Sequence, residues 1–213
     1  MDVPRVDGRV ERGRESRRSV LDRAMDIASV EGLESLSVRR LATELELSKS
    51  GVFAQFGSKE ELQLATVRAA VDVFVARVVR PAMRCRVGAH RVAGLGEAWL
   101  RYVEEPVFSG GCFFTAVAAE FDARPGRVRD AIGAARRDWQ KLYETTIAEA
   151  VAMGEISAEV DPGLLAFELD AVARAANEDA LLFDDPAVYD RARRILRNRL
   201  QAVGVAPVDD VLG

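Results

Sequence analysis

The pattern of apolar and polar positions predicts helices along most of the chain. Between Ser37 and Glu61 it predicts two short helices, a tight turn and the start of a longer helix. In the first short helix, one face is formed by residues at the i, i+3, i+4 and i+7 spacing, namely Val38, Leu41, Ala42 and Leu45. Ser37 and Ser48 precede the two short helices, where a hydroxyl oxygen can accept hydrogen bonds from the free N–H groups of a first turn.

The second short helix is expected to run from Lys49 to Phe56 and to end at Gly57. Val52, Phe53 and Phe56 would form the apolar side with which it packs on the domain. The next residues, 58–61, read Ser-Lys-Glu-Glu, which is a capping-box sequence that starts the third helix. Two short helices joined by a tight turn form a helix-turn-helix, whose second helix enters the DNA major groove.

Candidate DNA contacts lie on this reader helix and around it. Short or cationic side chains in its first turn allow the backbone to approach bases and phosphates. Gln55 can pair with an adenine edge or a phosphate, and Lys59 lies in a first helical turn, where N–H groups attract phosphate. The expected DNA contacts are Ser37, Arg39, Arg40, Ser48, Lys49, Ser50, Gly51, Phe53, Gln55 and Lys59.

At these residues the chain resembles the TetR/AcrR family of bacterial transcriptional regulators. The resemblance is carried by residues 37–62 and extends more loosely from about Ser19. The family usually ends its reader helix with an aromatic residue, any residue and His-Phe, followed by a Ser-Lys-Glu-Glu-Leu run. Here these positions read Phe53-Ala54-Gln55-Phe56 and Ser58-Lys59-Glu60-Glu61-Leu62.

Three residues depart from the family pattern. Phe53 stands where the family often has Tyr, so a hydroxyl contact to phosphate is missing, and Gln55 replaces His. Glu46 stands in the turn where Gly is common. A residue other than Gly with a positive φ costs on the order of 1 kcal/mol, and a carboxylate near DNA repels phosphate.

The whole chain is predicted to be all-α, with about nine helices. A first helix is expected at about 16–30 and a long fourth one from Lys59 to about Arg80, ending before Pro81. Further helices are expected at 89–103, 112–124, 125–153, 162–182 and 186–203. The expected divisions are a disordered arginine-rich arm at 1–15, a helix-turn-helix domain at 16–61, a helical ligand-binding and dimerisation domain at 62–205 and a tail at 206–213. The arm is either a solvated tail or a segment that lies along DNA.

The last two long helices are the candidates for dimerisation. Spacing puts Leu165, Leu169, Val172 and Ala176 on one helical face, which forms either a dimer interface or ordinary intramolecular core. The resemblance implies that paired C-terminal helices form a four-helix interface. A two-fold dimer would place two reader helices on successive major-groove turns of a palindromic site.

Aromatic residues gather in the middle of the chain. Each one alone is well explained as core, but as a group they can line an apolar cavity between helices. The resemblance implies that such a cavity binds a small effector. The expected ligand-binding residues are Trp99, Tyr102, Phe113, Phe114, Phe121, Trp139, Tyr143 and Asn177.

Composition argues against several other classes of protein, namely metal-binding, enzymatic, membrane-spanning and secreted ones. With 49% hydrophobic and 30% charged residues the chain can fill a core, while its net charge of −4 is not typical of a nucleic-acid binder unless basic residues gather locally. His90, Cys85 and Cys112 form no recognisable metal set or disulfide framework, so we expect no metal, no cofactor and no enzyme. No apolar run approaches the roughly 18 residues of a membrane span, and the first residues lack a signal-peptide core. A reducing cytoplasm fits these features.

These features together favour a ligand-responsive homodimeric transcriptional regulator, most simply a repressor, whose partners are double-stranded DNA and an unidentified small effector. The alternative is an all-α small-molecule-binding or interaction protein whose helix-turn-helix has lost DNA binding. The acidic balance, Glu46 and the missing Tyr hydroxyl favour that alternative. Positive potential on the reader face would distinguish the two.

Overall fold

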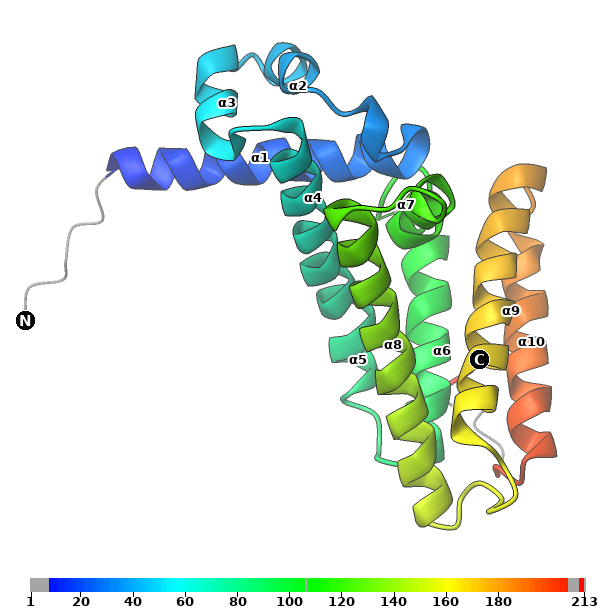
Figure 1. Cartoon of the computed structure of the whole chain (residues 1–213). Helices are drawn as coiled ribbons and strands as arrows, with labels where there is room; N and C mark the ends of the chain where they lie inside the picture. Colours follow the sequence, from blue (N-terminus) through cyan, green and yellow to red (C-terminus); the bar gives the residue numbers. More distant parts are fainter. Residues whose placement is uncertain (1–7, 106, 207–210, 213) are drawn as a thin grey trace, which may run out of the picture.

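The computed structural model describes residues 8–105, 107–206 and 211–212, and this part of the chain is helical and contains no strand. The N-terminal unit consists of α1 (Gly8–Glu31), the 3-10 turn η1 (Leu33–Ser35), α2 (Val38–Glu44) and α3 (Lys49–Phe56). Figure 1 shows α1 lying across one end of the bundle that the later helices form, with α2 and α3 on the far side of α1.

The bundle contains the remaining helices, several of which run side by side along its length (Figure 1). They are α4 (Lys59–Phe74), the π-helix η2 (Val75–Val79), α5 (Arg80–Ala82), α6 (Ala89–Glu104), α7 (Phe113–Phe121), α8 (Arg127–Ala152), α9 (Pro162–Phe183) and α10 (Ala187–Ala202). Because α4, η2 and α5 follow one another without a break, the described residues form nine helices in the sense of the expected all-α fold. None of these helices is long and apolar enough to cross a membrane.

Two predicted boundaries were wrong. α1 begins at Gly8, so residues 8–15, expected to be a disordered arm, are helical; residues 1–7 of that arm lie outside the described part. The stretch is rich in Arg and Glu, which are good helix formers even without an apolar stripe. The fourth helix continues through Pro81 to Ala82. Pro81 directly follows the π-helix η2, where the hydrogen bonds have already shifted from the α pattern, so its missing N–H does not interrupt a regular α-helical ladder.

The local signals of the helix-turn-helix are confirmed. The hydroxyls of Ser37, Ser48 and Ser58 each accept a hydrogen bond of 3.1 Å from the backbone N–H three residues later. Glu46 has a φ of 55°, in the left-handed region that favours Gly. The turn therefore keeps the geometry of the motif at an energetic cost.

Hydrogen bonds fasten the N-terminal unit to the bundle. Asp26 on α1 accepts from the N–H (2.9 Å) and hydroxyl (2.7 Å) of Ser109, and Ser29 accepts from the N–H of Gly110 (3.0 Å). Burial raises the pKa of Asp26, but the bonds from Ser109 and the charge of Arg23 outweigh it and hold that pKa below its ordinary value. A Cβ at Gly110 would overlap the backbone of Ser29, so the loop can approach α1 this closely only with Gly.

A second contact joins α7 to η1. The carboxylate of Glu120, near the end of α7, accepts from the N–H groups of Leu33 (2.7 Å) and Glu34 (3.0 Å). These are free donors at the start of a helical turn, and a carboxylate there is favourably placed. The described structure thus links α7 to the segment just before α2.

Candidate nucleic-acid interface and internal cavity

The reader helix α3 buries one side and exposes another. Val52 and Phe56, four residues apart, are 1% and 6% exposed and pack on the domain. Lys49, Ser50 and Gly51 are exposed, as expected for a DNA-facing turn. Phe53 is 53% exposed, so the expectation that its ring packs on the domain was wrong. It lies one position beyond the buried side, and its ring belongs to the outer surface of the unit.

Gln55 is turned toward α1. Its Nε2 donates to the hydroxyl of Ser16 (3.2 Å), and its backbone carbonyl accepts from Arg17 (2.7 Å). The guanidinium of Arg17 in turn lies 4.3 Å from the centre of the Phe56 ring. These contacts of Gln55 and Arg17 therefore hold α3 against α1. The side-chain amide of Gln55 would have to break its hydrogen bond with Ser16 before it could contact a base.

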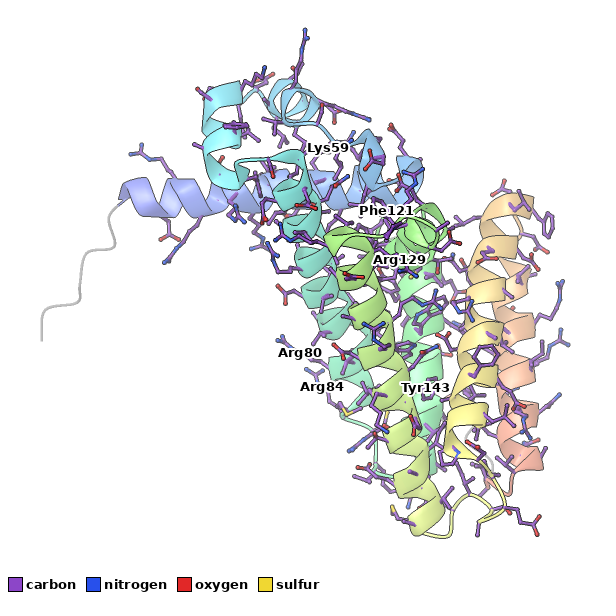
Figure 2. The ribbon with its side chains drawn as sticks, viewed as in Figure 1. Lys59, Arg80, Arg84, Phe121, Arg129 and Tyr143 are labelled. Carbon is purple, nitrogen blue, oxygen red and sulfur yellow. The ribbon has the colours of Figure 1, made fainter. Side chains whose placement is uncertain are left out.

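Two of the cations expected to contact the DNA backbone already bind carboxylates of this chain. Lys59 donates to the carbonyl (2.6 Å) and carboxylate (2.9 Å) of Glu34, at the end of α4 nearest the N-terminal unit (Figure 2). Arg40 binds both carboxylate oxygens of Glu31 (2.6 and 2.7 Å) and also Glu44 (2.7 Å). The hydrogen bonds that Arg40 donates, to Glu31 first and then to Glu44, raise the pKa of Arg40 above its ordinary value. Both cations thus already have carboxylate partners.

Arg39 and Lys49 are different. Both are exposed, and within the described residues neither has a carboxylate at ion-pair distance. Ser37 and Ser48 are exposed beside them and accept hydrogen bonds as helix caps, which leaves their hydroxyl protons free to donate. We call α2, α3 and the first turn of α4 the reader unit. Within it, Arg39 and Lys49 are the cations most available to a ligand.

A cavity of about 500 Å³ lies among α4, η2, α6, α7, α8 and α9. Its walls are largely apolar and aromatic. Phe74 of α4 is at the centre of the aromatic wall, edge-to-face with Trp139 (ring centroids 5.1 Å apart) and with Phe114 (6.0 Å). Volume and lining are those of a small-molecule pocket.

Charged side chains gather in part of this lining. Asp170 on α9 is 5% exposed and accepts from the indole N–H of Trp139 (3.0 Å) and from Nε of Arg174 (2.7 Å). A guanidinium nitrogen of Arg136 lies 3.8 Å from the same carboxylate. Arg68 and Asp138 also line the cavity. Each oxygen of the buried carboxylate therefore has a hydrogen-bond donor, and one of the two donors is a cation.

The structure brings together three of the eight expected ligand-binding residues, Trp99, Phe114 and Trp139. Phe113 and Phe121 lie in the core instead, and Phe121 is near the junction with α1 (Figure 2). Tyr102 lines a second hollow of about 450 Å³ between α5 and α6. These three placements overturn the expectation for this cavity.

Two expected polar groups of the cavity serve the backbone instead. The hydroxyl of Tyr143, inside the bundle (Figure 2), donates to the carbonyl of Val92 (3.3 Å), and burial raises the pKa of Tyr143. The amide oxygen of Asn177 accepts from the N–H of Cys112 (3.0 Å). Cys112 lines the cavity but is 2% exposed, and burial raises the pKa of its thiol, so the protonated form is favoured.

Sequence reasoning missed the helix α4 side of the cavity and its charged groups. The missed lining residues include Val67, Arg68, Val71, Phe74, Val75, Arg136, Asp170 and Arg174. They come from separate helices, and no fixed spacing links them. The one available signal was Asp170, a carboxylate on a helical face that also carries Ala166 and Ala173.

The expected dimerisation face was also placed wrongly. Leu165, Leu169 and Ala176 are at most 3% exposed and pack in the core of their own chain, and Val172 packs against that core. The opposite side of α9 is apolar and open, with Leu164 58%, Phe167 56% and Leu182 77% exposed. Because both sides of α9 are apolar, spacing alone could not tell which of them is buried.

A helix-turn-helix held on a helical bundle that encloses a cavity defines a class of protein, the helix-turn-helix transcriptional regulators. Comparison with known proteins agrees. A family profile described as "Bacterial regulatory proteins, tetR family" matches residues 20–66, and one described as "Tetracyclin repressor-like, C-terminal domain" matches residues 88–196. The chain belongs to the TetR family of bacterial transcriptional regulators.

Individual relatives support this assignment. The chain is 26% identical over 153 residues to the transcriptional regulator AcuR of Cereibacter sphaeroides, covering 70% of this chain and 68% of AcuR. A TetR regulator from Chloroflexus aurantiacus has the same fold, with a TM-score of 0.85 at 24% identity over 92% of this chain and all of the other. AibR, solved with isovaleryl coenzyme A and operator DNA, has a TM-score of 0.66 at 17% identity over 89% and 98% of the two chains.

Proposed function

We propose that this TetR-family regulator is a homodimeric repressor that binds a palindromic operator and releases it when a small effector enters the internal cavity. One observation carries the proposal. The cavity is lined by Val67, Val71 and Phe74 of α4, and the same helix begins at Lys59, three residues after the reader helix ends. A ligand that moves α4 therefore moves the reader unit.

Helix α7, which forms another part of the cavity lining, is also in contact with the segment before the reader helices. Phe114 and Thr115 on α7 line the cavity, and Glu120 near the end of the same helix holds the N–H groups of Leu33 and Glu34. Glu34 in turn binds Lys59. For an effector to release DNA, it must bind the DNA-incompetent arrangement of these helices more tightly than the competent one. The complex of AibR with a small molecule and operator DNA supports ligand binding and DNA binding within one such fold.

The exposure and ion pairing of each side chain suggest which residues contact DNA. Lys49 and Arg39 contact phosphates directly, and Lys59 and Arg40 reach phosphate by leaving their carboxylate partners, which are exposed enough to be exchanged. The first turn of α3, with Ser50 and Gly51, approaches the base edges. The remaining expected contacts, Ser37, Ser48, Phe53 and Gln55, serve the backbone approach or the position of the helix.

Dimerisation uses the outer face of α9, with Leu164, Phe167 and Leu182, continued by Ile195 on α10, which is 45% exposed. Exposed apolar residues that line up along one helix are typical of an interface. A second copy related by a two-fold axis would bury the same residues on both chains and pair the two reader helices.

A specific-binding titration tests the proposal. DNA from upstream of the gene is titrated with purified protein at two salt concentrations, with scrambled DNA as competitor, and a randomised-site selection is run in parallel. We expect a palindrome and a salt-dependent affinity. Lys59→Ala should lower the slope of log affinity against log salt by about one for each protomer bound. Lys141→Ala, at an exposed position on α8, is the matched control and should leave the slope unchanged.

The opposing result is specific. If selection returns no palindrome and Lys59→Ala leaves affinity and slope unchanged, the protein is not an operator-binding repressor of this kind. The second candidate function, an effector-binding protein without DNA binding, would then hold. It is favoured by the carboxylates that occupy Arg40 and Lys59 and by the exposed Glu46 in the turn.

A further inference from the structure

We infer that the effector of this cavity is a carboxylate with an apolar body, held by Arg136 and Arg68 while the body lies against the aromatic wall. The inference deepens the proposed function and rests on it only in that the cavity takes a ligand. Arg68 belongs to α4 and Arg136 to α8, and both line the cavity. The two cations therefore face the same cavity from neighbouring helices.

The charges of the lining favour an anion. The cavity is lined by three guanidinium groups and two carboxylates, which leaves one positive charge in excess. Asp170 is already bound by the Trp139 indole and by Nε of Arg174. The 3.8 Å between Arg136 and Asp170 is longer than a hydrogen bond, so the N–H donors of Arg136 are not used by that carboxylate. Planar guanidinium donors match the two oxygens of a carboxylate.

Arg68 adds a second available cation. It is exposed at the residue level, and within the described part of the chain no carboxylate lies at ion-pair distance from it. It is one position after Val67, which is 2% exposed and also lines the cavity, so the same turn of α4 offers an apolar contact and a charge. A ligand with one charged end and one apolar end fits both.

A cationic ligand fits less well, although the aromatic wall of Phe74, Trp99 and Trp139 could accept one by cation–π contact. The one buried carboxylate that would complete such a site is compensated by Arg174 and approached by Arg136. A bound cation would add a like charge to this group. A neutral ligand would make no ion pair with the guanidinium groups of Arg68 and Arg136, so it would gain less from this lining than an anion.

The chain carries its own reporter of this binding. It has two tryptophans, Trp99 and Trp139, and both line the cavity. Their fluorescence in the full-length protein therefore changes when the cavity fills, in the absence of DNA. This readout separates the ligand class from repression, because binding without release of DNA would contradict only the proposed function.

The experiment titrates the protein with three apolar bodies, phenylbutyl, naphthylmethyl and octyl. Each body carries in turn a carboxylate, a hydroxyl or an amine. We expect the carboxylates to bind about tenfold more tightly than the matched alcohols, since a charge-assisted hydrogen bond is stronger than a neutral one. Equal or tighter binding of the amines, or no binding by any of the nine compounds, would overturn the inference.

Variants locate the head group. Arg136→Gln should bring the carboxylate to about the affinity of the alcohol, and Arg68→Gln should reduce the preference in part. Arg137→Gln changes the neighbouring arginine, which is exposed on the same helix and does not line the cavity, and should keep the preference. A carboxylate preference that survives in the Arg136→Gln and Arg68→Gln proteins would place the head group elsewhere and refute this site.

Discussion

The cations near the reader helix and the cations of the cavity are neutralised by carboxylates of different exposure. In the reader unit, Lys59 and Arg40 pair with Glu34, Glu31 and Glu44, and the paired side chains are between 29% and 48% exposed. In the cavity, Arg174 pairs with Asp170, whose side chain is 5% exposed. Exposed pairs contribute about 0–1 kcal/mol, while breaking a buried pair costs several times more. The reader unit can therefore exchange its partners for phosphate, whereas the pair in the cavity is a fixed part of the bundle.

The largest effect is expected from removing the buried carboxylate. Asp170→Ala leaves Arg174 and the Trp139 indole without their acceptor, and should lower the free energy of unfolding by about 3 kcal/mol. Glu168→Ala, two residues away on α9, breaks a pair with Arg199 in which both side chains are 37% exposed, and should cost under about 1 kcal/mol. Denaturant titrations of both variants at one protein concentration check this. Equal losses would remove the distinction between the two kinds of pair.

The junction between the two regions gives the next largest effect. Gly110→Ala places a methyl group where the backbone of Ser29 lies, so the loop must move away from α1. We expect a loss of roughly 2 kcal/mol in unfolding free energy and a weaker effect of effector on DNA affinity. Gly133→Ala, within α8, meets only the flexible end of Arg137 and is the control. If Gly110→Ala leaves both quantities at the wild-type level, the contact does not join the regions.

A smaller effect is expected in the turn of the reader unit. Glu46→Gly removes a left-handed residue that has a side chain and should stabilise the fold by about 1 kcal/mol. It also removes a carboxylate beside the reader helix, so DNA affinity should rise. Glu46→Gln keeps the backbone conformation but not the charge, and therefore separates the two contributions. Denaturation reports the first and operator titration the second; destabilisation by Gly would show that φ is not strained here.

The smallest effect is expected from a change in the carboxylate partner of Lys59, which tests whether Lys59 exchanges Glu34 for a DNA phosphate. Glu34→Gln removes the charge that Lys59 must leave before it binds phosphate, so operator affinity should increase by about twofold. Glu155→Gln, which loosens a pair between a half-buried carboxylate and the exposed Arg86 in the bundle, should leave operator affinity unchanged. Weaker operator binding by the Glu34 variant would mean that Glu34 positions Lys59 for DNA instead of competing with it.

The helix-turn-helix was predictable because its determinants are local. Each serine cap acts on an N–H three residues ahead, and the left-handed turn at Glu46 depends on one residue. The first turns of α1 were not predicted because residues 8–15 form a polar helix without the apolar stripe by which a sequence pattern indicates a helix. The turn of Gln55 toward Ser16 is a contact across 39 residues that no local pattern contains.

The cavity was only partly predictable for a related physical reason. Trp139 and Asp170 are 31 residues apart and meet because α8 packs on α9. Which aromatic ring faces an empty space depends on the rotation of several helices about their axes. The aromatic residues in the middle of the sequence therefore predicted a cavity, but not its lining. The packing of the helices determines that Trp99 lines the cavity while Phe113 lies in the core.

The π-helix η2 has a consequence for the register of the chain. In this segment the N–H of Arg80 bonds to the carbonyl of Val75, five residues earlier, so one turn holds more residues than an α-turn. Deleting one residue there would allow a regular α-helix, and because the wide turn had absorbed the extra residue, the helix before it would keep nearly the same orientation about its axis relative to α5. Val75 and Val79, which line the cavity, both lie within this wide turn, so the change would be felt at the cavity wall. A relative with a one-residue gap at 75–79 is therefore expected to have a regular α-helix in place of η2.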